Sequence, residues 1–420
     1  MSTLVIEGGQ RLSGTVDVEG NKNAALPLLA ACLLTKEECV LTNVPRISDV
    51  EVMARLLLDL GAEVVGIGST TLRVRCPQVT KDDPDGGLVG RLRGSVLLLG
   101  PLLARRGRAN LAPPGGDFPA RRTIGTHLEA LHAMGARSIA GFGHRLETPD
   151  GLKPTSMYLY EASVTGTETA LLAAAAANGV TEIRHAACEP HVAELCLFLQ
   201  QLGVGITGGG TSTIRVEGGA TLHGAEHRLW GDYIEGGSWA VVAAVTGGEI
   251  EVNGARGEDM EVIAAVLKRM NICCDIDGDR LRIEQSRLQA AGRITTGLWP
   301  GFPSDMVSLV TVLATQCEGR TLIHDWLYEL RLFALEQLSG MGAANDLFLC
   351  DPHRIIVSGP RRLRGRPLDS RDLRSGMALI AAALAADGQS RLAPLETVER
   401  GYGRLVERLN SLGAKVAKVP

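Results

Sequence analysis

The stretch MARLLLDLGAEV, residues 53–64, decides the fold because variants of it recur five more times along the chain. Met53, Leu56, Leu57 and Leu60 have the i, i+3, i+4, i+7 spacing of an amphipathic helix, and the glycine that follows is typical of a helix C-cap. The other copies are LEALHAMGARSI (128–139), LCLFLQQLGVGI (195–206), IAAVLKRMNICC (263–274), ALEQLSGMGAAN (334–345) and LVERLNSLGAKV (405–416). Their capping glycine or asparagine residues are 74, 68, 68, 71 and 71 residues apart, which predicts six structural repeats.

A second and more uniformly apolar helix is predicted upstream of each copy, as in AALPLLAACLL (24–34) and SWAVVAAVTGG (238–248). A helix that is apolar nearly all round is a buried helix. Short β-like runs such as CVLTNV (39–44) and EIEVNGA (249–255) separate the two helices. The repeat is therefore predicted to be β-α-β-α-β-β, and three such repeats that close on themselves would form one α/β domain.

The N-terminal segment TLVIEGGQRLSG (3–14) resembles TIRVEGGATLHG (213–224), which comes near the end of the third repeat. We therefore expect a first hairpin at the N-terminus that completes a domain begun elsewhere in the chain.

Composition excludes several classes of protein. The chain has 420 residues, a formal net charge of −4 and no basic patch of the kind that nucleic-acid binders usually show. Its nine cysteines form no CxxC pair and favour a reducing compartment, while neither a signal peptide nor a membrane helix is recognisable. We expect a cytoplasmic protein that binds neither nucleic acid nor membranes. No metal-ligand spacing, P-loop or dinucleotide-binding fingerprint points to a metal or cofactor.

The residues just before the buried helices suggest an anion site. Lys22 lies in GNKN (20–23), Arg93 in RLRGS and Arg374 in DLRSG. A lysine at a helix start opposes the helix dipole, which indicates a role in binding. Free N–H groups at several equivalent helix ends, together with these three cations, would concentrate positive charge around an anion.

Simpler interpretations remain open for the same residues. Ser304 and Asp305 in FPSDM could cap a helix, and any single arginine could be solvated at the surface. His127 falls on an apolar stripe and could be a core histidine. Asp117 in PPGGDFPARR could be an ordinary turn residue.

Several motifs in order along the chain resemble the enolpyruvyl transferase family, and within it the UDP-N-acetylglucosamine 1-carboxyvinyltransferases of peptidoglycan precursor synthesis. The resemblance covers essentially the whole chain, and its motifs are GNKNAALPLLAACLL, PPGGDFPARR, FPSDM, YELR, DLRSG and ERGY. It implies two inside-out α/β barrel domains, each of three β-α-β-α-β-β repeats, with the active site in the cleft between them. The first domain would span 22–231, and the second 1–21 with 232–420.

The reaction implied by the resemblance is transfer of enolpyruvate from phosphoenolpyruvate to the 3-hydroxyl of UDP-N-acetylglucosamine, with release of phosphate. The resemblance assigns Asp305 as the base and Asp117 as the acid, with Lys22 and Arg400 as further catalytic residues. Such a compact anion requires arginine forks and a lysine. The resemblance places Lys22, Arg93 and Arg122 at the phosphate and Arg331, Arg374 and Arg400 at the carboxylate. The acceptor residues that it implies are Asn23, Arg122, Thr123, Ser163, Val164, Thr165, Asp305 and Leu327.

The sequence departs from the family pattern at four positions. Asp117 replaces the cysteine acid of most members, so fosfomycin, which alkylates that thiolate, is expected to fail. Thr123 and Gly125 replace a proline and an aspartate of the uracil pocket, and Glu161 replaces a lysine near the diphosphate. An acceptor such as a free nucleotide therefore remains an alternative, and so does a catalytically silent protein that only binds a polyanion, although the retained Asp305 argues against silence.

The segment 110–122, which is rich in proline and glycine and carries Asp117, is a candidate lid. Closure of such a loop over the substrates would deliver the acid and exclude water.

Overall fold

The computed structural model describes residues 2–116, 123–329, 331–343 and 347–420. The chain forms two compact units, which we call the inserted unit (Gly20–Trp230) and the split unit (Met1–Glu19 and Gly231–Pro420). Each unit has its own hydrophobic core. The predicted first domain began at 22 rather than 20 and ended at 231 rather than 230.

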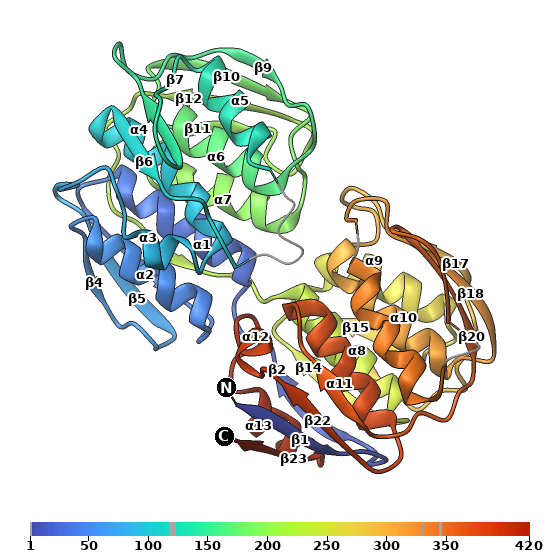
Figure 1. Cartoon of the computed structure of the whole chain (residues 1–420). Coiled ribbons are helices and arrows are strands. Elements are labelled where there is room, and N and C mark those ends of the chain that lie inside the picture. The colour runs from blue at the N-terminus through green and yellow to red at the C-terminus, as the bar shows by residue number, and fades with distance from the viewer. Residues whose placement is uncertain (1, 117–122, 330, 344–346) are drawn as a thin grey trace. The chain divides into compact units, whose positions relative to one another are not determined.

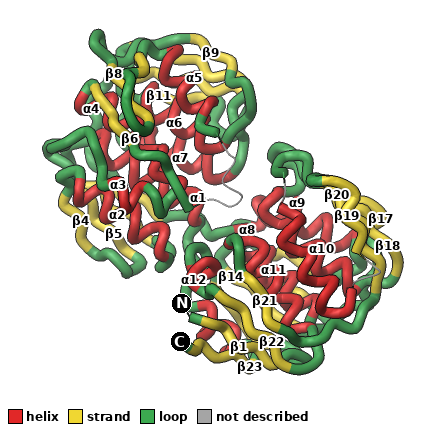
Figure 2. Tube along the Cα trace, in the orientation of Figure 1, coloured by secondary structure: helices red, strands yellow, loops and turns green. Residues whose placement is uncertain are grey.

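Each unit contains three separate β-sheets around a central group of helices (Figures 1 and 2). The strands alternate buried and exposed residues, so one face of each sheet packs on the helices and the other faces solvent. The helices thus lie inside and the sheets outside, as the inside-out arrangement predicts. The sheets share no strand among the described residues, so neither unit is a closed hydrogen-bonded barrel.

The inserted unit holds the first three repeats. The elements of the first are α1 (Lys22–Ala31), η1 (Cys32–Leu34), β3 (Glu38–Thr42), α2 (Ser48–Asp59), β4 (Glu63–Val65), β5 (Thr71–Arg75) and, from the end of the unit, β13 (Glu226–Arg228). The second has α3 (Gly86–Val89), η2 (Arg93–Leu98), α4 (Leu99–Arg106), β6 (Arg108–Leu111), α5 (Gly125–Ala133), β7 (Arg137–Ser138) and β8 (His144–Glu147). The third has β9 (Ser156–Tyr158), α6 (Val164–Ala174), β10 (Gly179–Arg184), α7 (Pro190–Gln201), β11 (Gly205–Thr207) and β12 (Thr213–Gly218).

The split unit holds the other three. The fourth repeat has β2 (Ser13–Asp17), α8 (Tyr233–Val245), β14 (Glu249–Asn253), α9 (Gly257–Arg269), β15 (Cys274–Asp277) and β16 (Arg280–Ile283). The fifth has β17 (Gly292–Thr295), η3 (Ser304–Met306), α10 (Val307–Gln316), β18 (Gly319–His324), η4 (Arg331–Glu336), η5 (Ser339–Ala343), β19 (Leu347–Asp351) and β20 (Arg354–Gly359). The sixth has β21 (Pro367–Asp369), α11 (Leu373–Ala385), β22 (Gln389–Ala393), α12 (Glu396–Glu399), α13 (Leu405–Ser411), β23 (Lys415–Val419) and β1 (Thr3–Glu7).

The predicted N-terminal hairpin is wrong in detail. Strand β1 pairs with β22 and β23 and completes the sheet of the sixth repeat, whereas β2 pairs in parallel with β14 in the sheet of the fourth. The two strands therefore lie in different sheets of the split unit. The similar segment at 213–224 behaves in the same way, because β12 and the following β13 also enter different sheets.

The helix predictions hold in five of the six repeats. In α8 all thirteen residues are buried, as expected for a helix that is apolar nearly all round. The six capping residues, Gly61, Gly135, Gly203, Asn271, Gly342 and Gly413, all have positive φ. The predicted amphipathic helix at 334–345 is wrong: the 3-10 turn η4 and the π-type turn η5 replace it in the described residues. Ser339 and two glycines within a few residues disfavour a regular helix there.

Among the described residues, no helix is both long enough and apolar enough to cross a membrane.

Candidate active site

Asp305 is the centre of a charged cluster in the split unit. It lies in the short helix η3, and its Oδ1 accepts a hydrogen bond from Arg331 at 3.1 Å. Its Oδ2 accepts from Nε and Nη2 of Arg374, at 3.2 and 3.0 Å. The alternative that Asp305 caps the helix is wrong, because Pro303 occupies the N-cap position and no side chain caps η3. Two guanidinium groups therefore hold one carboxylate whose side chain is 27% exposed.

Arg374 is buried, which excludes a solvated surface role for this arginine. Asp372 caps α11 by accepting hydrogen bonds from the backbone N–H groups of Arg374 and Ser375, and this cap sets the start of the helix. Burial lowers the pKa of Arg374, but Asp305, Tyr402 and Asp232 together outweigh burial and the net shift is upward. The guanidinium is thus held as a cation in a site with little water.

Tyr402 is a partner of Arg374 that the sequence analysis missed. Its hydroxyl accepts a hydrogen bond from Nη1 of Arg374 at 3.1 Å and lies 2.8 Å from Oγ of Ser238 in α8. The Tyr402 side chain is fully buried. Its position in the ERGY motif, two residues after Arg400, was the only signal in the sequence.

Arg331 follows the same pattern with a second missed aromatic residue, Tyr328 of the YELR motif. The guanidinium of Arg331 lies 4.4 Å from the centre of the Tyr328 ring, a cation–π distance. Burial lowers the pKa of Arg331, whereas Asp305, Tyr328 and Asp325 raise it, and the net shift is upward. Arg331 also donates to Oγ of Ser304 at 2.8 Å.

Lys22 is the first residue of α1 in the inserted unit, as predicted. Its Nζ lies 2.8 Å from Oδ2 of Asp49, in the first turn of α2. Asn21 caps the helix by accepting from the backbone N–H of Asn23. The ion pair offsets the unfavourable position of a cation at a helix start. Both side chains are almost buried, with exposed fractions of 12% and 5%.

Arg93 begins η2 and donates to the carbonyl of Thr123 at 2.7 Å, so two predicted site residues lie together in the inserted unit. Burial and the charge of Arg93 lower the pKa of His144.

Asp117 and Arg122, which the resemblance assigns as the acid and a phosphate ligand, lie outside the described residues. The lid prediction needs a correction at its start, since Asn110 and Leu111 belong to strand β6.

The start of α6 brings three predicted acceptor residues together. Ser163 caps the helix by accepting from the N–H of Gly166 at 3.2 Å, and Val164 and Thr165 form its first turn. Nε2 of the buried His127 lies 2.8 Å from Oγ1 of Thr165, within hydrogen-bond distance. This core histidine therefore contacts a residue of the predicted site.

Glu161, one of the departures from the family pattern, is near the same helix start. Its Oε1 accepts a hydrogen bond from Oγ1 of Thr126 at 3.1 Å. Thr126 follows Gly125, the first residue of α5, and α5 packs on α6. A negative side chain is therefore held next to the loop for which the resemblance implies an interaction with a diphosphate.

The remaining predicted residues lie in both units. Leu327 and Arg400 are partly buried in the split unit, where Leu327 belongs to the turn after β18 and Arg400 ends the short helix α12. Asn23 is partly buried in α1 of the inserted unit. Arg400 is two residues from Tyr402, which contacts Arg374.

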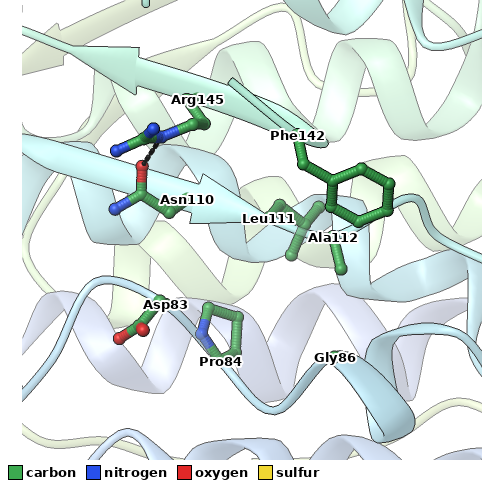
Figure 3. Close-up of a pocket in the computed structure, with 8 residues that line it drawn as sticks. All are labelled: Asp83, Pro84, Gly86, Asn110, Leu111, Ala112, Phe142 and Arg145. Carbon is green, nitrogen blue, oxygen red and sulfur yellow. Dashed lines mark hydrogen bonds between the residues drawn. The ribbon is translucent and has the colours of Figure 1, made fainter. Parts of the chain in front are cut away.

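A surface pocket of the inserted unit is separate from these residues (Figure 3). It lies between β6, β8 and the start of α3, where Nε of Arg145 donates to Oδ1 of Asn110 at 3.1 Å. Three of its lining residues, Asn110, Leu111 and Ala112, fall within the segment predicted as a lid, 110–122. Its charged lining residues, Asp83 and Arg145, have opposite signs, and none of the predicted catalytic or substrate-binding residues lines it, so we do not assign it to the site.

Glu168 in α6 gives a prediction about stability. Burial and then the charge of Glu189 raise its pKa well above 4.5. The native protein therefore keeps a proton that the unfolded chain releases, and the free energy of unfolding is expected to fall as the pH rises above about 5. Replacing Glu168 with Gln should reduce this fall and stabilise the protein at about pH 8, by about 1.4 kcal/mol per unit of pKa shift removed.

Urea unfolding at both pH values measures the Glu168 effect, with Glu217→Gln on the exposed face of β12 as the control. The same pH dependence in Glu168→Gln and in the unchanged protein would contradict the assignment of a protonated buried carboxyl group.

Comparison with known proteins finds likenesses over the full length. A family model described as EPSP synthase (3-phosphoshikimate 1-carboxyvinyltransferase) matches residues 6–409. The UDP-N-acetylglucosamine 1-carboxyvinyltransferase of Bradyrhizobium diazoefficiens is 43% identical, over 99% of this chain and 98% of its own. The protein of the same name from Treponema denticola is 40% identical over 99% of both chains. Among solved structures, the enolpyruvyl transferase NikO from Streptomyces tendae has a TM-score of 0.89 at 25% identity, over 100% of this chain and 99% of its own.

Proposed function

The chain belongs to the EPSP synthase family of enolpyruvyl transferases, and we propose that it transfers enolpyruvate from phosphoenolpyruvate to the 3-hydroxyl of UDP-N-acetylglucosamine. The observation that carries the choice of acceptor is the full-length identity of 43% to a protein with that name. The product would enter peptidoglycan precursor synthesis. A cytoplasmic location is part of the proposal, supported by the cysteines of the described residues, which are in the reduced thiol form.

The proposed reaction is an addition followed by an elimination. In the addition, Asp305 takes the proton of the acceptor hydroxyl, the oxygen bonds to C2 of phosphoenolpyruvate, and Asp117 gives a proton to C3. In the elimination, the Asp117 carboxylate takes a proton back from C3 and the double bond between C2 and C3 forms again. The bond from C2 to the phosphate oxygen breaks, and that oxygen takes the proton held by Asp305. Inorganic phosphate leaves, and the acceptor keeps the enolpyruvyl group.

The donor is a small anion, and the proposal assigns six cations to its two ends. Lys22, Arg93 and Arg122 would bind the phosphate, and Arg331, Arg374 and Arg400 the carboxylate. The ion pairs of Asp305 support a more specific step. A donor carboxylate that binds Arg331 and Arg374 would compete with Asp305 for their N–H groups. The Asp305 carboxylate would then be released to accept the hydroxyl proton.

The acceptor side of the proposal rests on eight residues. We assign the sugar and its diphosphate to Asn23, Arg122, Thr123, Ser163, Val164, Thr165, Asp305 and Leu327. Free backbone N–H groups at the start of α6 are suited to a diphosphate. The carboxylate of Glu161 beside this loop opposes an anion, and this observation keeps a second acceptor, a nucleotide with fewer phosphates, as the alternative.

Release of phosphate from phosphoenolpyruvate tests the choice of acceptor. We expect release with UDP-N-acetylglucosamine and little release without an acceptor. Release only with UMP would support the alternative acceptor and make Thr123, Gly125 and Glu161 the residues that explain it. Release that is independent of any acceptor would contradict transfer altogether.

Fosfomycin gives a prediction that depends on Asp117. A carboxylate cannot replace the thiolate that the drug alkylates, so we expect no fosfomycin adduct in the intact mass of the protein. Asp117→Cys should gain one adduct, and this variant shows that the drug reaches the site. An adduct on the unchanged protein, mapped to the loop that contains Asp117 or to another catalytic residue, would contradict the proposed role of this position.

A further inference from the structure

Asp325 is a buried carboxylate next to the charged cluster of the split unit, which consists of Asp305, Arg331 and Arg374. It follows strand β18, and its side chain is fully buried. Removing a carboxylate from water is costly unless it receives several good hydrogen bonds. Asp325 belongs to none of the motifs found in the sequence and is not among the residues assigned to the substrates above.

Three donors satisfy the Asp325 carboxylate. Its Oδ1 accepts from Oγ1 of Thr296 at 2.9 Å and from the backbone N–H of Leu327 at 3.3 Å. Its Oδ2 accepts from Oγ of Ser304 at 2.7 Å. All of these donors are uncharged, and within the described residues no cation forms a direct ion pair with Asp325. Its negative charge is close enough to raise the pKa of Arg331, and the hydroxyl group of Ser304 links the two side chains by hydrogen bonds.

The sheet explains why these residues meet. Strands β17 and β18 are parallel, with Thr295 beside His324, so the residues that follow them emerge at the same edge of the sheet. Thr296 and Asp325 are those next residues. Asp325 is also fixed through its own carbonyl, which lies 2.7 Å from Nδ1 of His353.

The direction of the Ser304 hydroxyl follows from this arrangement. A serine hydroxyl has one proton, and that of Ser304 is donated to Asp325. Only the lone pairs of Oγ then remain, and they accept the hydrogen bond from Nη1 of Arg331 at 2.8 Å. The same nitrogen donates to Oδ1 of Asp305 at 3.1 Å. A chain of hydrogen bonds thus runs from Arg331 through Ser304 to Asp325.

We propose that Asp325 is a positioning residue, which orients Ser304 as an acceptor and thereby holds the Arg331 guanidinium in place for the donor carboxylate. This inference rests on the proposed enolpyruvyl transfer. The backbone contact to Leu327 adds a second effect, since it fixes the turn from Asp325 to Tyr328, whose ring lies against the same guanidinium.

The test measures the dissociation constant of phosphoenolpyruvate by calorimetry, so it does not depend on turnover. Asp325→Asn keeps the size of the side chain but removes its charge, and its amide group can donate toward Ser304. We expect the dissociation constant to rise about 10- to 100-fold, as for loss of a hydrogen bond to a charged group. Ser304→Ala should raise it similarly, and the double variant should bind no more weakly than the weaker single variant.

Glu235→Gln is the control for the Asp325 variant. Glu235→Gln changes another buried carboxyl group of the split unit, one that pairs with Arg408, and it should lower the melting temperature without weakening donor binding. Unchanged donor binding in Asp325→Asn and in Ser304→Ala would overturn the positioning role. Additive effects of the two substitutions would overturn the path through Ser304. If Asp325→Asn does not fold, Ser304→Ala decides alone, and failure of the unchanged protein to bind the donor would overturn the proposed function as well.

Discussion

Asp305→Asn is expected to lower kcat of enolpyruvyl transfer by about 10²- to 10⁴-fold, the contribution typical of a general base. The single amide oxygen can accept from Arg331 or from Arg374 but not from both in the native geometry, and it cannot take a proton from the acceptor hydroxyl. The ion pairs at 3.1 and 3.0 Å would also be lost. Phosphate release at saturating concentrations of both substrates measures the change in kcat.

Asp259→Asn is the matched control for this prediction. Asp259 is a buried aspartate of the split unit on α9, where its Oδ2 lies 3.6 Å from Nε of Arg256. Its replacement should affect stability but leave kcat close to that of the unchanged protein. A kcat for Asp305→Asn within a few-fold of the control would remove Asp305 from the role of base.

Arg374→Lys is expected to lower kcat/KM for phosphoenolpyruvate by about 30-fold or more, as for truncation of a buried, hydrogen-bonded charge pair. Arg374 uses all three guanidinium nitrogens, two on Asp305 and one on Tyr402. A lysine keeps the charge but has a single nitrogen and cannot reproduce this fork. The loss should fall mainly on KM for the donor.

Steady-state kinetics with the donor varied measures this effect. Arg256→Lys, at the arginine that pairs with Asp259, makes the same replacement outside the predicted site and should leave KM for the donor unchanged. If Arg374→Lys and Arg256→Lys gave the same KM, the carboxylate role of Arg374 would be wrong.

The fold was predictable because the sequence pattern that specifies each helix is local and recurs in every repeat. The stripe of Met53, Leu56, Leu57 and Leu60 and the following Gly61 describe a helix and its cap by spacing alone, and six copies indicate six repeats. The exception at 334–345 has a local cause as well, because Ser339 and nearby glycines interrupt the pattern. The N-terminal strands were harder, since spacing does not show which sheet a strand will join.

The site was predictable only where a residue belongs to a motif. Asp305, Arg331 and Arg374 were named from FPSDM, YELR and DLRSG, and the structure places all three together. Their mutual ion pairs were not foreseen, because sequence separations of 26 and 69 residues carry no sign of contact.

The supporting residues were missed for a different reason. Tyr402 and Asp325 act through buried hydrogen bonds, and a single tyrosine or aspartate after an apolar run looks like many others. The partner of Lys22 was equally hidden, since Asp49 belongs to the start of the next helix. These contacts join different elements of one repeat, so they depend on how those elements pack together and not on a fixed spacing along the chain.

Mass analysis of the acceptor after reaction tests the central claim most directly. Phosphoenolpyruvate labelled with ¹³C in its three carbons is incubated with UDP-N-acetylglucosamine and the protein, and phosphate is measured in the same sample. We expect one labelled enolpyruvyl group per acceptor and an equal amount of phosphate, with both lost in Asp305→Asn. Phosphate release that leaves the acceptor unlabelled would contradict it.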